Sequence, residues 1–135
     1  MQFHRVACYR SGLENTLADQ LKSAGVSFTY ETTKINYMVP ATLHTYTPDF
    51  VLSNGIIIES KGLFSVEDRK KHLLVKAQHP ELDIRFVFQN PHNRLYKGSP
   101  TTYAMWAEKN GFKWARKTIP AEWLKEPTKE NKKYD

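Results

Sequence analysis

The spacing of apolar residues predicts a helix followed by two strands in the first third of the chain. Apolar side chains recur every three or four positions over residues 11–24, which is typical of an amphipathic helix, and Gly25 ends it. Ser11 with Glu14 three residues later fits a capping box. Apolar residues then alternate over 26–30 and 35–39, which predicts two strands joined by a turn at residues 32–33.

A β-hairpin is predicted over residues 46–61, after a connector at residues 40–44. Two apolar runs meet there at Asn54-Gly55, a dipeptide that tolerates the positive φ angles of a tight turn. An unpaired charge in such strands would be costly to desolvate. Three charged residues nevertheless interrupt them: Asp49, Glu59 and Lys61.

The second half of the chain alternates helices with short strands. Ser65 and Asp68 are placed to begin a helix over 66–78, which His79-Pro80 ends. We expect its apolar residues to face the core and its basic residues, with His72, to face solvent. The core-facing set is Val66, Leu73, Leu74 and Ala77. The elements predicted after it are a buried strand at 84–88, a loop at 89–99, a helix from Ser99-Pro100 to about residue 110, a strand at 112–115 and a helical turn at 121–124 that packs Trp123.

The length of 135 residues indicates one domain, with 1–10 as an N-terminal arm or edge strand and 125–135 as a polar, frayed tail. No apolar run is long enough for a signal peptide or a membrane span, so we expect a cytoplasmic protein without a membrane partner. The single cysteine, Cys8, excludes an intramolecular disulfide and is interpreted as a small hydrophobic residue. His92-Asn93 is interpreted as part of a solvated loop rather than of an HNH nuclease site.

The net charge of +6 favours a polyanionic partner. Basic residues crowd the helix that follows the charged hairpin, which favours contacts with DNA phosphates over a merely solvated face. The predicted DNA-binding residues are Arg69, Lys70, Lys71, His72, Lys76, Arg94 and Lys97.

The charged residues of the hairpin suit phosphodiester hydrolysis. One or two Mg²⁺ ions held by carboxylates can neutralise the phosphoryl oxygens, generate a hydroxide nucleophile and stabilise the leaving alkoxide. An ideal two-residue turn at Asn54-Gly55 pairs Phe50 with Glu59, however, and so places Asp49 and Glu59 on opposite faces. We therefore predict an irregularity between Pro48 and Phe50, or at the turn.

Pro48-Asp49, nine intervening residues and then Glu59-Ser60-Lys61 resemble the PD-(D/E)-x-K nuclease motif. A wider resemblance, over about residues 10–127, is to phage endonuclease I, the Holliday junction resolvase family of T7-like phages. The stretches that carry it are Arg10 to Glu14, His44 to Phe50, Lys61 to Leu63, Asp68 to Leu74, Gln78 to Arg85, Leu95 to Thr101 and Ile119 to Trp123.

The resemblance implies an α/β (α+β), restriction-endonuclease-like fold, with a mixed sheet flanked by helices. It implies that Glu14, Asp49 and Glu59 are metal-binding carboxylates, that Ser60 supplies a carbonyl to the metal, and that Lys61 is the catalytic lysine. The cofactor would be Mg²⁺, with Mn²⁺ as a substitute and two ions per active site. It also implies an intertwined, domain-swapped homodimer in which residues 40–44 cross over and Glu14 completes the partner's site.

The predicted activity is resolution of four-way junctions and branched DNA, in the host-cell cytoplasm if the protein is phage-encoded. Two alternatives stay open. One is a PD-(D/E)-x-K nuclease that acts on linear duplex. The other is a non-catalytic module that binds branched DNA, against which the paired carboxylates argue because they would repel phosphate.

Overall fold

The computed structural model describes residues 9–39 and 42–128. Its elements, in chain order, are α1 (Gly12–Ser23), β1 (Phe28–Tyr30), β2 (Ile35–Val39), β3 (Thr42–Tyr46), β4 (Phe50–Leu52), β5 (Ile56–Lys61), α2 (Val66–Gln78), β6 (Asp83–Phe88), α3 (Tyr103–Lys109), β7 (Lys113–Arg116) and α4 (Ala121–Leu124). Within the described ranges no helix is long and apolar enough to cross a membrane.

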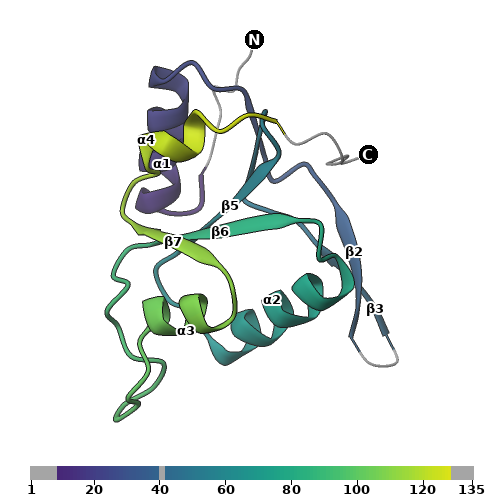
Figure 1. The fold of residues 1–135 in the computed structure, drawn as a ribbon, viewed down its shortest axis with the longest axis vertical. Coiled ribbons are helices and arrows are strands. Elements are labelled where there is room, and N and C mark those ends of the chain that lie inside the picture. The colour runs from purple at the N-terminus through teal and green to yellow at the C-terminus, as the bar shows by residue number, and fades with distance from the viewer. Residues whose placement is uncertain (1–8, 40–41, 129–135) are drawn as a thin grey trace.

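A five-stranded mixed sheet in the order β1-β4-β5-β6-β7 forms the centre of the molecule. The strands β1, β4 and β5 are antiparallel, whereas β5, β6 and β7 are parallel. In Figure 1, α1 and α4 lie on one side of this sheet and α2 and α3 lie on the other. The predicted mixed sheet flanked by helices is therefore confirmed as an α+β fold.

The sheet separates two apolar cores, because successive side chains of a strand point to opposite faces. On β5, Ile57 packs into the core beneath α2 and α3, whereas Ile56 and Ile58 pack into the core beneath α1 and α4. Phe86 and Val87 of β6 divide in the same way. Both faces of the central strands are buried, which explains their continuous apolar runs.

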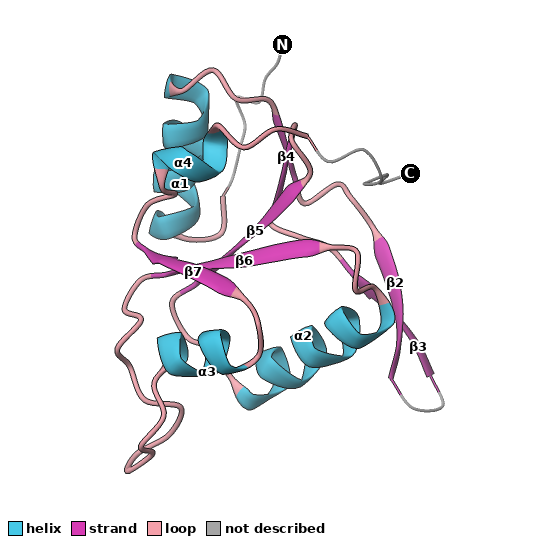
Figure 2. Ribbon diagram, viewed as in Figure 1, coloured by secondary structure: helices cyan, strands magenta, loops and turns pink. Residues whose placement is uncertain are grey.

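The strands β2 and β3 form a separate antiparallel pair beside α2 (Figure 2). Both strands predicted over 26–39 exist, but they belong to different sheets, since β1 pairs with β4 and β2 with β3. Glu31, at a φ of 53°, lies where the chain leaves β1. The predicted connector at 40–44 is wrong for its described part, because residues 42–44 belong to β3. Residues 40 and 41 lie outside the described ranges.

The turn between β4 and β5 contains the irregularity that the sequence required. Phe50 pairs with Ile58 and Val51 with Ile57, one residue away from the ideal two-residue register. Three residues therefore link the strands, and Gly55 takes a φ of 91° and donates its N–H to Leu52 O at 2.9 Å. The Asn54 amide is used in tertiary contacts, donating to the backbone oxygens of Trp123 and Glu126 at 3.0 Å each. The altered turn moves Asp49 next to Glu59.

The helix α2 has the predicted bounds but only part of the predicted core face, since Leu74 packs against the core whereas Ala77 is exposed. Its capping box is complete, with Ser65 and Asp68 each accepting the other's backbone N–H. The residues buried on it are His72 and Val75, whereas Val66 and Leu73 are 46% and 39% exposed. The prediction that His72 faces solvent is wrong, because its uncharged ring packs edge-on against the rings of other core residues.

Two boundaries also differ from prediction. The helix α3 begins at Tyr103, after the cap Thr102, rather than at Ser99-Pro100. Residues 125–128 are described, and Glu126 is held by a two-oxygen ion pair with the buried Arg85 at 2.7 and 2.9 Å. The frayed tail thus does not start at residue 125. Cys8 with most of the predicted arm (residues 1–8), and residues 129–135 of the predicted tail, lie outside the described ranges.

Candidate active site

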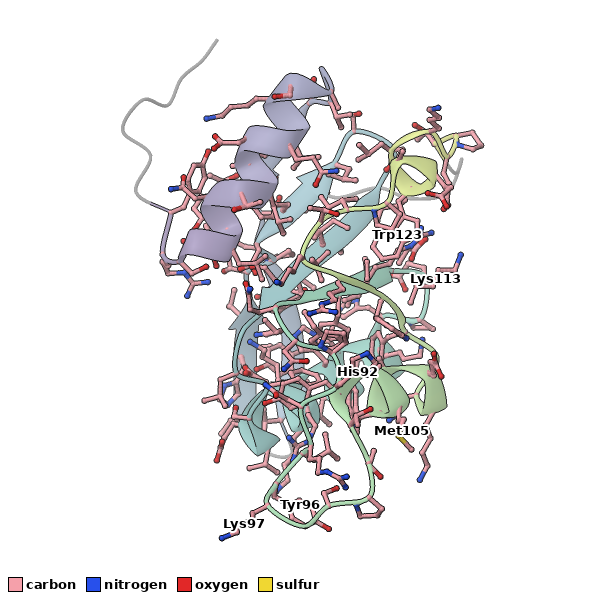
Figure 3. All side chains as sticks on the ribbon, turned by 90° about the vertical axis from the view of Figure 1, so that its left-hand side faces the viewer. His92, Tyr96, Lys97, Met105, Lys113 and Trp123 are labelled. Atoms are coloured by element: carbon pink, nitrogen blue, oxygen red, sulfur yellow. The ribbon has the colours of Figure 1, made fainter. Side chains whose placement is uncertain are left out.

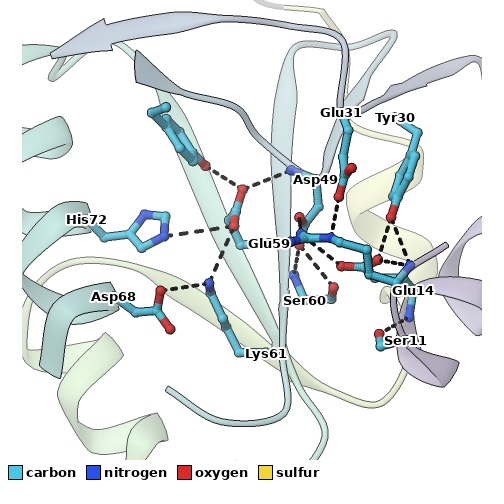
Figure 4. Close-up of polar contacts among 12 residues, drawn as sticks. Ser11, Glu14, Tyr30, Glu31, Asp49, Glu59, Ser60, Lys61, Asp68 and His72 are labelled. Carbon is cyan, nitrogen blue, oxygen red and sulfur yellow. Dashed lines mark hydrogen bonds and ion pairs between the residues drawn. The ribbon is translucent and has the colours of Figure 1, made fainter. Parts of the chain in front are cut away.

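The predicted catalytic residues converge where β5 ends and the chain turns toward α2 (Figure 4). Asp49 comes from the segment before β4, whereas Glu59, Ser60 and Lys61 come from β5 itself. Asp49 and Glu59 are buried, at 3% and 2% exposed. The site divides into two halves that meet at Asp49, one beside α1 and one beside α2.

Asp49 connects the two halves. Its backbone N–H donates to Glu59 Oε2 at 3.0 Å. Its carboxylate Oδ2 accepts from the Ser60 backbone N–H at 2.9 Å and from the Ser60 hydroxyl at 3.0 Å. Burial raises the pKa of Asp49, opposed by the hydrogen bond from the Ser60 backbone. The carboxylate is therefore held in one orientation beside the central strand β5.

Glu59 lies deeper, toward α2. The Tyr46 hydroxyl donates to Glu59 Oε2 at 2.6 Å, while Oε1 faces Lys61 Nζ and His72 Nε2, each at 3.9 Å. Burial, and then the nearby negative charge of Asp49, raise the pKa of Glu59 from 4.5 to about 7. Bringing a divalent cation to this carboxylate would favour its charged form.

Lys61 is held between the hairpin and α2. Its ammonium lies 3.3 Å from Asp68 Oδ1 and 3.9 Å from Glu59 Oε1, and its side chain is only 14% exposed. Asp68 is also the residue that accepts the Ser65 N–H in the capping box of α2. The start of α2 therefore sets the position of the lysine.

His72 of α2 lies in the core beside Glu59. It is fully buried, and both of its ring nitrogens have no hydrogen-bond partner among the described residues. Burial, followed by the charges of Lys61 and Lys71, keeps the pKa of His72 well below its ordinary value. The ring is therefore neutral, and its burial rules out the direct DNA contact predicted for it.

Glu14 brings α1 to the other half of the site. Ser11 caps the helix by accepting the Glu14 N–H at 3.1 Å, so that half of the expected capping box exists. The Glu14 carboxylate turns instead toward Arg10 and Tyr30, accepting from the Arg10 N–H at 2.9 Å and from the Tyr30 hydroxyl. It is 4% exposed and lies beside Asp49 of the same chain.

The remaining predicted DNA-binding residues are basic side chains at or near the surface. Arg69 donates to Phe64 O at 2.7 Å, and Lys76 Nζ lies 3.4 Å from Gly111 O, so both heads also contact the fold. Lys70 is exposed, and Lys71 is partly buried with its ammonium over the Tyr46 ring. Arg94 and Lys97 are exposed on the loop before α3, and Lys97 projects from its end in Figure 3. Their contacts with DNA stay a prediction.

The donor set fits a hard divalent cation. Glu14, Glu31 and Asp49 each place one carboxylate oxygen within 4.8 Å of the others, and carboxylate oxygens are the ligands that Mg²⁺ prefers. A cationic group already satisfies them, since Arg10 Nη2 lies 3.3 Å from Glu14 and 3.1 Å from Asp49. Glu59 lies next to this group. Its Oε2 atom accepts hydrogen bonds from the Asp49 backbone N–H and from the Tyr46 hydroxyl.

The residues of the PD-(D/E)-x-K pattern, Asp49, Glu59 and Lys61, thus lie together in a mixed α+β fold, which is the arrangement expected of a hydrolytic enzyme of that pattern. The family model for phage endonuclease I matches residues 1–134 of the chain. Endonuclease I of Escherichia phage T7 is 58% identical over 126 residues, which cover 93% of this chain and 85% of that protein. Endodeoxyribonuclease 1 of Enterobacteria phage T3 is 56% identical over 122 residues, which cover 90% and 80%.

The chain therefore belongs to the phage endonuclease I family and is an endodeoxyribonuclease. The predicted family and enzyme class are confirmed. Sequence reasoning missed five residues that contact the predicted site residues. They are Arg10, Tyr30, Glu31, Tyr46 and Asp68. Of these, only Asp68 had a signal in the sequence, because it lies in the first turn of α2, a few residues after Lys61.

Proposed function

We propose that the protein is a Mg²⁺-dependent, structure-selective endonuclease that resolves Holliday junctions and other branched DNA by phosphodiester hydrolysis. Family membership supports the nuclease part of this proposal. The observation that carries the chemistry is the meeting of Asp49, Glu59 and Lys61 at the C-terminal part of the central strand β5, in a chain with a net charge of +6. The site of action would be the cytoplasm of the host cell.

Glu14, Asp49, Glu59 and the Ser60 carbonyl would hold the metal. Mg²⁺, when bound, supplies positive charge to the phosphoryl oxygens and lowers the pKa of water. Mn²⁺ would substitute for it, and two ions would occupy each site.

The role of Lys61 would be to stabilise charge on the reacting phosphate rather than to stabilise the fold. Its ammonium lies between two anions, Asp68 at 3.3 Å and Glu59 at 3.9 Å, and these two ion pairs fix its position in the folded protein. A fixed cation stabilises charge that develops on the phosphoryl oxygens without reorganising during the reaction. Ser60 orients Asp49, and Tyr46 orients Glu59, through the hydrogen bonds described above.

The functional unit would be a homodimer, because a symmetric pair of sites matches two opposed strands of a junction. Glu14 and Asp49 of one chain already lie together here, so that exchange of α1 between protomers would place an equivalent Glu14 in the same position.

Mixed dimers of Glu14→Ala and Asp49→Ala chains decide whether Glu14 acts across the dimer. If it does, one of the two sites in each mixed dimer has both carboxylates intact, and nicking of a junction returns. If Glu14 serves its own chain, both sites stay defective and the mixture is inactive. Each variant alone is the control in either case.

Substrate choice is tested by cleavage of a synthetic four-way junction and of linear duplex with the same sequences. The proposal predicts paired incisions in the junction and little cutting of the duplex. Equal rates on both substrates would contradict junction selectivity and favour a linear-duplex nuclease. Binding of the junction should weaken steeply with salt, because recognition through phosphates releases counterions.

A further inference from the structure

Arg10 lies among three carboxylates that come from three different parts of the chain. Its Nη2 atom is 3.3 Å from Glu14 Oε2 and 3.1 Å from Asp49 Oδ1, and its Nε atom is 2.6 Å from Glu31 Oε2. Its backbone N–H also donates to Glu14 Oε1 at 2.9 Å. One guanidinium thus contacts all three carboxylates of the acidic group beside α1 and offsets part of their negative charge.

Two of the carboxylates are buried, whereas the cation is largely exposed. Glu14 and Asp49 side chains are 5% exposed, and the Tyr30 hydroxyl and Ser60 hold them in place. The Arg10 side chain is 66% exposed. The guanidinium can therefore withdraw toward solvent while the two carboxylates keep their positions.

Glu31 differs from the other two partners in what it contacts. It binds Arg10 through Nε, whereas Glu14 and Asp49 are both contacted by Nη2. It is also one of two non-glycine residues with positive φ among the described residues, at 53°, a backbone conformation that disfavours a side chain. Its N–H donates to Asp49 O at 3.2 Å, which ties this strained position to the site.

We propose that Arg10 is an internal counter-ion of the metal site, which holds the carboxylates together before metal binding and is displaced from Glu14 and Asp49 when a divalent cation binds. The guanidinium and the metal compete for the same carboxylate oxygens, so each weakens the binding of the other. Glu31 keeps the displaced arginine at the rim of the site. This inference rests on the proposed metal dependence and adds a residue that sets metal affinity.

The first experiment measures Mg²⁺ binding to the metal-free protein by calorimetry, without DNA. We expect Arg10→Ala to lower the dissociation constant by about tenfold, equivalent to about 1.4 kcal/mol of binding free energy. Arg10→Gln, which keeps most of the length but loses the charge, should do the same. Arg116→Ala, at an exposed arginine on β7, is the charge-matched control and should leave the constant unchanged within about twofold.

The second experiment tests whether the position of the guanidinium matters and not only its charge. In EDTA, Arg10→Ala should melt at a lower temperature than the unmodified protein, because the carboxylates then repel one another. Millimolar methylguanidinium should raise that melting temperature and weaken Mg²⁺ binding in Arg10→Ala. It should have neither effect on the unmodified protein or on Arg116→Ala.

The outcomes separate this inference from the proposed function. If the unmodified protein binds no divalent cation, both the metal dependence and the inference fail. If it binds Mg²⁺ but Arg10→Ala and Arg10→Gln bind it equally or more weakly, the counter-ion role is wrong and the proposed function stands. Methylguanidinium without effect on the alanine variant would likewise overturn the competition.

Discussion

Replacing Glu59 with Gln should change how the stability of the metal-free protein depends on pH. Gln keeps the shape of the side chain and one oxygen, which can accept from the Tyr46 hydroxyl and the Asp49 N–H as Oε2 does now. Its amide can donate to His72 Nε2, an atom with no hydrogen-bond partner among the described residues. The substitution therefore removes the titrating group with little loss of packing.

The sign and size of the effect follow from the raised pKa of Glu59. In the unfolded chain this carboxyl titrates at 4.5, and in the folded protein at about 7. The folded state thus retains a proton that the unfolded state releases, so its contribution to stability is complete below pH 4.5 and is lost as the pH rises through 7. A shift of that size corresponds to roughly 3 kcal/mol, at about 1.4 kcal/mol per pKa unit.

Urea unfolding in EDTA between pH 4.5 and pH 8 measures this loss. The free energy of unfolding of the unmodified protein, minus that of Glu59→Gln, should fall by roughly 3 kcal/mol across the range. Taking the difference removes most of the opposite contribution of His72, whose lowered pKa costs stability as the pH falls. Glu67→Gln, at an exposed glutamate of α2, is the control. A difference that stays constant with pH, or rises, would refute the burial argument for Glu59.

Two further substitutions test the start of α2. Ser65→Ala removes the acceptor for the Asp68 N–H at 3.1 Å, and urea unfolding should show a loss of about 1 kcal/mol of stability. Asp68→Asn removes the anion 3.3 Å from Lys61 Nζ, and junction cleavage under single-turnover conditions should slow by roughly tenfold, with unchanged junction affinity. An equal slowing in Ser65→Ala would mean that Asp68 acts only through the cap.

The elements could be predicted where local chemistry determines them. Ser65 and Asp68 mark the first turn of α2, and His79-Pro80 ends it, so its bounds were predictable from the sequence alone. Which strands pair was not predictable, because alternation in 26–30 and 35–39 carries no information about partners. The core face of α2 was predicted only in part because His72 counts as polar in a hydrophobic pattern, whereas a neutral imidazole beside Phe86 and Tyr46 packs as an aromatic ring.

The candidate site was predictable to the extent that its residues are neighbours in sequence. Glu59 and Lys61 share a face of one strand, and the conflict between Asp49 and an ideal turn correctly indicated an altered register. Arg10 and Glu31 could not be assigned in this way. Their role depends on contacts between α1, β1 and the hairpin in the folded protein. The spacing of these residues in the sequence does not indicate those contacts.

Asp49→Ala, measured for binding and for cleavage of the same four-way junction, tests the assigned site at the residue where its two halves meet. Asp49 lies between Glu14 and Glu59, the other two proposed metal ligands, so junction affinity should persist in the variant while cleavage in Mg²⁺ is abolished. A variant that still cleaves the junction at a rate near that of the unmodified protein would contradict the assignment of this site.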